Sequence, residues 1–129
     1  MNKIIVEVSI GELLDKISIL EIKQEKIKDP EKLKFINNEH SILKDQLKNS
    51  VKSDDKLNNL YQSLKEINAK LWVIEDDKRQ CEKDKDFREK FIKLSRDVHF
   101  LNDDRAKIKL EINNHTGSVI KEIKEYTSY

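Results

Sequence analysis

The chain contains almost none of the residues that build tight turns. Only two glycines and one proline occur among its 129 residues. An all-β sandwich or barrel needs turn residues about every ten positions. This scarcity therefore excludes most β architectures and leaves long helices joined by few loops. Because charged residues make up 40% of the chain, apolar periodicity has to distinguish packed helices from a disordered polar chain.

Apolar residues recur at spacings of three and four over most of the chain, which predicts amphipathic helices. The predicted helices cover residues 10–28, 30–48, 54–83 and 87–113. Ser9 and Glu12 form a capping box before the first helix, and Gly117 suits a left-handed stop after the last. The short break between the last two helices predicts a long antiparallel hairpin. With a tail over residues 117–129, the chain is predicted to be a single helical domain.

Residues 3–8, with the sequence KIIVEV, are too few for a helix and rich in β-branched side chains. They predict one β-strand. This strand could pair with its copy in a dimer, pair with the tail around Ile120–Ile123, or lie extended on the helices. The predicted fold class is therefore mainly α, with a short N-terminal β-strand followed by a four-helix bundle-like array.

Charge and hydropathy exclude several classes of partner. Lysines and arginines number 26 and aspartates and glutamates 25, whereas nucleic-acid-binding proteins usually carry a basic excess on one face or tail. No apolar run is long enough to span a membrane, and the N-terminus lacks a signal-peptide pattern. Cys81 is the single cysteine, so no internal disulfide forms. We expect a cytoplasmic protein with no nucleic-acid and no membrane partner.

The first and last predicted helices each carry a second apolar line beside the main one. A helix with two apolar faces is usually packed on both sides. Four helices of one small chain are too few to cover all of this surface, so a homodimer is predicted. The second lines consist of Ile19 and Ile22 on the first helix, and of Ile92, Phe100, Ala106 and Leu110 on the last.

Several polar residues stand where helical periodicity demands apolar ones. Arg105 lies at the centre of the last stripe and His40 at the centre of the second. Glu75 and Glu82 continue the third stripe, two turns apart. Burying an unpaired ion costs several kcal/mol. These groups must therefore pair with one another, reach solvent at a helix end, or contact a ligand.

Each of these residues has a structural and a functional interpretation. Arg105 is an internal salt-bridge partner, an anion ligand or one half of an intersubunit pair. His40 is more often a satisfied core histidine than a ligand. Glu75 and Glu82 either face one groove as candidate catalytic residues or sit at a solvated helix end. The chain has 22 lysines but only four arginines, which favours arginine being kept where a planar, bidentate fork is needed.

Common metal and phosphate sites have no counterpart in the sequence. Two glycines cannot form a glycine-rich phosphate loop, and one cysteine cannot form a zinc pair. The Glu-x-x-His spacing of di-iron bundles is missing, because the three histidines follow Asn37, Arg96 and Ile112 at that spacing. We expect no metal site and no cofactor.

Three segments resemble an uncharacterised family of bacterial and phage proteins, a domain of unknown function. They are SIGELLDKISILEIK at residues 9–23, LWVIEDDKRQCE at residues 71–82, and FIKLSRDVHFLNDDRAKIKLEIN at residues 91–113. The sequence departs from the family pattern at Lys78 and His99. The resemblance implies little about function, but it agrees with the apolar stripes in singling out Glu75, Glu82 and Arg105. The polar residues of the family's motifs map onto Glu75, Asp76, Arg79, Glu82, Arg96, Asn102, Asp103, Arg105 and Lys109.

Three functions follow from these patterns. The leading one is binding of a small anionic metabolite, such as a sugar-phosphate or nucleotide-sugar, in a polar groove of the bundle. Arg79, Arg96 and Arg105 would hold the anion, and Glu75 and Glu82 would orient hydroxyls or act in acid–base chemistry. The second is a structural or adaptor bundle whose polar residues only set helix register. The third is a small lyase- or isomerase-type enzyme that uses the same groove.

Overall fold

The computed structural model describes residues 2–129, which form four helices. These are α1 (Ile10–Lys26), α2 (Pro30–Ser50), α3 (Asp55–Asp84) and α4 (Glu89–Thr116). The prediction of a mainly α fold with a long helical hairpin is confirmed. No helix among the described residues is both long and apolar enough to cross a membrane.

The predicted N-terminal β-strand is wrong, because residues 2–129 contain no strand. Residues 3–8 form neither a helix nor a strand and pair with no other segment of the described chain. Ile4 and Ile5 are 90% and 83% exposed, so the backbone of this segment is open to water. A strand requires a neighbour that supplies ladder hydrogen bonds, and the helices of this fold offer no sheet edge.

The helix ends explain why the chain breaks where it does. Ser9 Oγ accepts the Glu12 amide at the start of α1, and Asp29 accepts the Glu31 amide next to Pro30 at the start of α2. Lys85 takes a left-handed conformation, with φ 56°, at the turn between α3 and α4. Gly117 ends α4 with φ 68°, as the sequence predicts.

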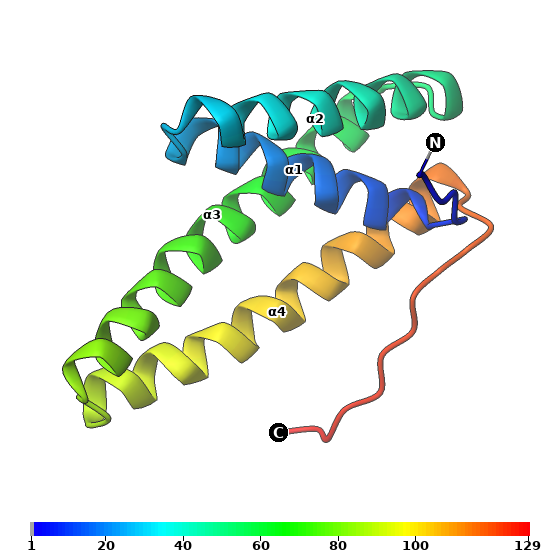
Figure 1. Ribbon diagram of the computed structural model, residues 1–129. Helices are drawn as coiled ribbons and strands as arrows, with labels where there is room; N and C mark the ends of the chain where they lie inside the picture. Colours follow the sequence, from blue (N-terminus) through cyan, green and yellow to red (C-terminus); the bar gives the residue numbers. More distant parts are fainter. Residues whose placement is uncertain (1) are drawn as a thin grey trace.

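The helices are arranged around α1 (Figure 1). The two longest helices, α3 and α4, run antiparallel from their shared turn and pack together as a hairpin. At the other end of this hairpin α1 lies across them, and α2 returns along α1 on the side away from α4. Since α1 contacts each of the other three helices, it is the element that holds the molecule together.

The core lies where α1 meets the hairpin. Leu14, Leu57, Leu64 and Ile112 form a buried cluster that joins α1, α3 and α4. Half-buried residues of α2 and its C-terminal end, such as Leu47, pack against this cluster. No residue of α2 is itself fully buried. The polar residues that the sequence singles out are therefore positioned chiefly by α1, α3 and α4.

Candidate functional site

The first turn of α1 is joined directly to the last turns of α4. The Gly11 amide donates to Asn113 Oδ1 at 2.7 Å, and the Ile10 amide donates to Ser118 Oγ at 3.2 Å. A Cβ atom at Gly11 would lie 2.6 Å from the carbonyl oxygen of Lys109. Glycine is therefore required here by the close approach of two helices. Because side chains of this chain occupy these amides, the N-terminus of α1 is not open to an anion.

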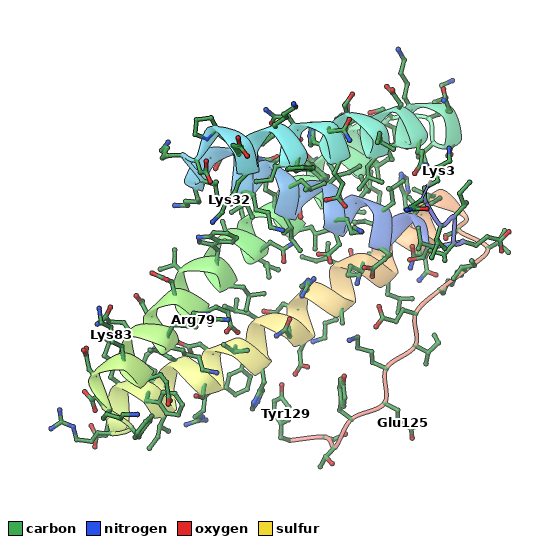
Figure 2. All side chains as sticks on the ribbon, in the orientation of Figure 1. Lys3, Lys32, Arg79, Lys83, Glu125 and Tyr129 are labelled. Atoms are coloured by element: carbon green, nitrogen blue, oxygen red, sulfur yellow. The ribbon has the colours of Figure 1, made fainter. Side chains whose placement is uncertain are left out.

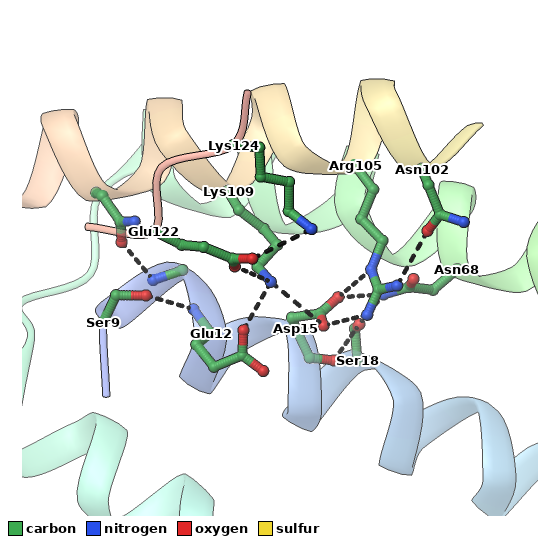
Figure 3. Close-up of polar contacts among 12 residues, drawn as sticks. Ser9, Glu12, Asp15, Ser18, Asn68, Asn102, Arg105, Lys109, Glu122 and Lys124 are labelled. Atoms are coloured by element: carbon green, nitrogen blue, oxygen red, sulfur yellow. Dashed lines mark hydrogen bonds and ion pairs between the residues drawn. The ribbon is translucent and has the colours of Figure 1, made fainter. Parts of the chain in front are cut away.

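Next along α1, the buried Asp15 collects donors from α3 and α4 (Figure 3). Arg105 Nε donates to Asp15 Oδ1 at 2.9 Å, and its Nη2 donates to Oδ2. Asn68 Nδ2 donates to the same Oδ1 at 2.8 Å and to Ser18 Oγ at 2.7 Å. Hydrogen bonds to Asp15 raise the pKa of the Arg105 guanidinium, against the opposing effect of burial. Arg105 is thus held as a cation by a carboxylate that is only 1% exposed.

Lys109 extends this network one turn further along α4. Its Nζ donates to Glu12 Oε2 at 2.7 Å and to Glu122 Oε2 of the tail at 3.3 Å, and it lies 3.9 Å from Asp15 Oδ2. The cation of Lys109 is therefore shared among three carboxylates of its own chain. This arrangement ties the tail to α1 and balances the charge of Lys109 within the chain.

Beside Arg105, a groove of about 320 Å³ opens between α1, α3 and α4. We call it the arginine groove. Arg79 projects from α3 on the side of α4 (Figure 2). The guanidinium of Arg79 forms no salt bridge with any carboxylate in residues 2–129, unlike that of Arg105. The groove is lined by Ile19, Ile22, Asn68, Leu71, Trp72, Glu75, Asp76, Arg79 and Arg105.

The structure brings only some of the predicted site residues together. Glu75, Arg79 and Arg105 line the arginine groove, whereas Glu82 is exposed and does not line it. Arg96 is exposed, with its guanidinium carbon 5.7 Å from the ring centre of Phe100. These last two residues lie outside the groove that holds the other three.

Two further predicted residues of α4 make contacts inside the chain. Asn102 Oδ1 accepts from Arg105 Nη1 at 3.2 Å and so helps to orient that guanidinium. Asp103 accepts a hydrogen bond from Tyr129, which lies beside α4 at the end of the tail (Figure 2). The ring of Tyr129 also packs against Phe100, with ring centres 5.4 Å apart.

His40 belongs to a separate polar cluster between α1, α2 and α3. Its Nε2 lies 2.9 Å from Glu21 Oε2, and Tyr61 donates to Glu21 Oε1. Burial raises the pKa of Glu21, but hydrogen bonds from Tyr61 and His40 and the charge of Lys65 outweigh burial and lower it. Burial and the Glu21 hydrogen bond raise the pKa of Tyr61. His40 is therefore an internal partner of Glu21 and does not line the arginine groove.

Sequence reasoning missed Asp15, the residue on which the Arg105 network depends. A signal for it exists in the spacing of Gly11, Asp15, Ser18 and Ile22, which places small and polar residues on one face of α1. Small residues allow two helices to approach closely, and a carboxylate on such a face requires a buried cation. Among residues 2–129, no three histidine, cysteine or acidic side chains are grouped so as to hold a metal ion.

Comparison with protein families decides the classification. The model of a family of unknown function, DUF6165, matches residues 4–129. The chain belongs to this family. No curated protein and no solved structure matches the chain. Membership of DUF6165 confirms the resemblance to an uncharacterised family and supplies no activity, so the function rests on the site itself.

Proposed function

We propose that the arginine groove binds a small sugar-like metabolite that carries one anionic group. A single observation carries this proposal: Arg79 presents an unpaired guanidinium to a groove that also holds Trp72 and two carboxylates. A guanidinium fork fits phosphate or carboxylate oxygens, and the carboxylates of Glu75 and Asp76 accept from hydroxyl groups. A sugar-phosphate or nucleotide-sugar offers both kinds of group in one molecule.

The charge balance of the groove limits the class of ligand that it can bind. The groove is lined by two positive charges, Arg79 and Arg105, and by two negative charges, Glu75 and Asp76. Arg105 is already paired with Asp15. A strongly anionic ligand would therefore meet two carboxylates and only one unpaired cation. This favours a sugar-phosphate, with one charged group and several hydroxyls, over a nucleotide-sugar, whose diphosphate carries two charges. Arg105 keeps the floor of the groove in place.

The groove has the size and lining of a small-molecule site. Its volume of about 320 Å³ lies at the lower end of the range of ligand pockets, roughly 300–1,000 Å³. Leu71 and Ile22 supply an apolar floor, and the half-buried indole of Trp72 supplies a flat face. Apolar walls with a few convergent polar groups are typical of such sites.

Thermal-shift and calorimetric titration with glucose 1-phosphate and UDP-glucose test this proposal. At least one of these probes should raise the melting temperature of the wild-type protein. Arg79→Met should weaken its binding by roughly 10- to 100-fold, because a hydrogen bond to a charged group contributes about 1.5–3 kcal/mol. Arg88→Met is the matched control, since Arg88 pairs with Asp86 at the exposed turn between α3 and α4.

Two results would count against ligand binding in this groove. The first is that neither probe binds the wild-type protein. The second is that Arg79→Met and Arg88→Met bind a probe equally well, which would place the binding elsewhere.

A second candidate is the structural or adaptor bundle, and a different observation favours it. The accessible surface of the chain is 9692 Å², whereas a compact monomer of 15.3 kDa should expose about 7,100 Å². The apolar residues Val73 and Phe100, on α3 and α4, are 49% and 37% exposed. An oligomer that covers the hairpin would account for both features without a small ligand.

The third candidate, a lyase- or isomerase-type enzyme, would depend on Glu75. Of the two predicted catalytic residues, this carboxylate lines the arginine groove and Glu82 does not. If the protein turns over a probe, Glu75→Gln should reduce turnover by roughly a hundredfold or more and change affinity far less. Glu82→Gln, outside the groove, is the comparison; equal turnover in both variants would exclude a catalytic role for Glu75.

A further inference from the structure

A second cavity of the described chain lies away from the arginine groove. It has a volume of about 660 Å³ and opens between α2, α1 and the start of α3. We call it the lysine groove, because Lys44, Lys48 and Lys52 line it. Since it shares no lining residue with the arginine groove, what it binds is independent of the function proposed above.

The interior of the lysine groove is apolar. Leu14 and Ile17 of α1 form its floor, and they are 3% and 1% exposed. Leu47 and Val51, at the end of α2, and Leu57 of α3 also line it. The cavity therefore lies directly over the hydrophobic cluster of the core. Its volume suits a small molecule.

The rim of the groove is positively charged. Three lysines line it against one acidic residue, Asp45. None of the three forms a salt bridge with a carboxylate of the described chain, although twelve such bridges occur elsewhere. Only Lys48 belongs to the last turn of α2, where a cation offsets the helix dipole. The helix dipole therefore accounts for only part of this basic rim, because Lys44 lies outside the last turn.

We propose that the lysine groove binds a fatty acid. The alkyl chain lies along the apolar lining, where its removal from water favours binding. The carboxylate stays at the mouth of the groove, where the unpaired ammonium groups of Lys48 and Lys52 attract it. A neutral lipid would leave the basic rim without a partner, and a cationic amphiphile would be repelled by it.

Calorimetric titration with dodecanoate, below its micelle concentration, tests the proposal. The wild-type protein should bind dodecanoate at one site and bind dodecyltrimethylammonium at least tenfold more weakly. The double variant Lys48→Gln/Lys52→Gln should weaken dodecanoate binding by roughly fivefold or more, because each exposed ion pair contributes up to about 1 kcal/mol. The matched control is Lys32→Gln/Lys34→Gln, which removes two exposed charges near the other end of α2.

A second variant tests the apolar interior separately. Val51→Phe places extra volume in the cavity without altering its charge, so it should weaken dodecanoate binding. The lysine variants, in contrast, change the charge and leave the volume of the cavity unaltered. Backbone amide signals of Val51 and Tyr61 should shift on titration, whereas those of Trp72 and Arg79 should not.

Three results would overturn the proposal. They are the absence of binding heat with dodecanoate, equal affinity for the cationic amphiphile, and equal losses in the two lysine double variants. None of them bears on the sugar probes, so failure here is distinguishable from failure of the arginine groove.

Discussion

Asp15 and Arg105 show how one buried carboxylate sets the role of a residue on another helix. Arg105 interrupts an apolar stripe, and its charge is balanced from α1, 90 positions away in the sequence. Asp15 in turn has three donors, two from Arg105 and one from Asn68. Breaking such a pair by removing one partner leaves a buried charge uncompensated, whereas removing both is far less costly.

Arg105→Met is therefore expected to destabilise the fold by about 3 kcal/mol, because it strands Asp15 in the interior. Asp15→Leu combined with Arg105→Met should be more stable than the sum of the two single effects, by about 1–3 kcal/mol. Urea unfolding of the four proteins measures this coupling. Additive effects would show that the two residues do not depend on each other. Arg88→Met should leave the urea midpoint unchanged, because the Arg88 side chain is exposed at the turn between α3 and α4.

Glu21 should make stability depend on pH. Its pKa in the folded state is lowered below the ordinary value of 4.5, so its contribution is present above that value and is lost as the pH falls through the folded pKa. The stability difference between wild type and Glu21→Gln should therefore shrink from about pH 5 to about pH 3. Urea unfolding at both pH values measures it, and a constant difference would contradict the role of Glu21.

At the scale of the element, α1 is the helix whose placement decides the fold. It is the shortest of the four helices, with 17 residues, yet it contacts all the others. Its first turn is fixed to α4 by Gly11 and Asn113, and its middle is fixed to α3 and α4 by Asp15. The amphipathic stripes of α3 and α4 form the hairpin, but α1 determines what the open end of the hairpin contacts.

Gly11→Ala distinguishes helix propensity from tertiary packing. Propensity alone predicts stabilisation by about 0.5–1 kcal/mol. The Cβ atom would instead meet backbone and side-chain oxygens of α4 at 2.6 and 2.9 Å, so we expect a loss of about 1–3 kcal/mol. Thermal unfolding decides between the two signs. For comparison, Lys16→Ala should be more stable than Lys16→Gly by about 1 kcal/mol, because Lys16 is exposed.

The molecule as a whole exposes an unusually large surface for its mass. The accessible surface exceeds that of a compact protein of this mass by about a third. The end of the hairpin beyond α1 and the segments before α1 and after α4, which form no helix, account for it (Figure 1). The second apolar line predicted on α1 is largely covered within the chain, since Ile22 is 1% exposed. On α4, Ile92 and Leu110 remain 55% and 37% exposed.

The predicted homodimer is therefore expected to use the hairpin. Light scattering at micromolar concentration should give about twice 15.3 kDa. Val73→Glu combined with Phe100→Glu should reduce the mass to that of one chain, because the two side chains line the same apolar groove of α3 and α4. Phe35→Glu, on the exposed face of α2, should leave the mass unchanged. A folded wild-type monomer would rule the dimer out.

The sequence alone determined the properties that depend on neighbours along the chain. Spacings of three and four, a nearly complete lack of turn residues and the caps at Ser9 and Gly117 specify four helices and their approximate ends, because these signals act within a few residues. The segment at residues 3–8 is the exception. Its β-branched composition favours a strand, but a strand also requires a partner, and composition carries no information about one.

Only the tertiary structure decided which polar residues share a site. Glu75, Arg79 and Arg105 converge on one groove, while Glu82, one turn beyond Arg79 on the same helix, does not line it. Arg105 has its counterion on α1, and His40 has its partner in Glu21. Helical periodicity specifies on which face of its helix a residue lies. It does not specify which other helix crosses that face, or at which position along the helix. That crossing depends on close contacts such as that of Gly11 with α4, between residues far apart in the sequence.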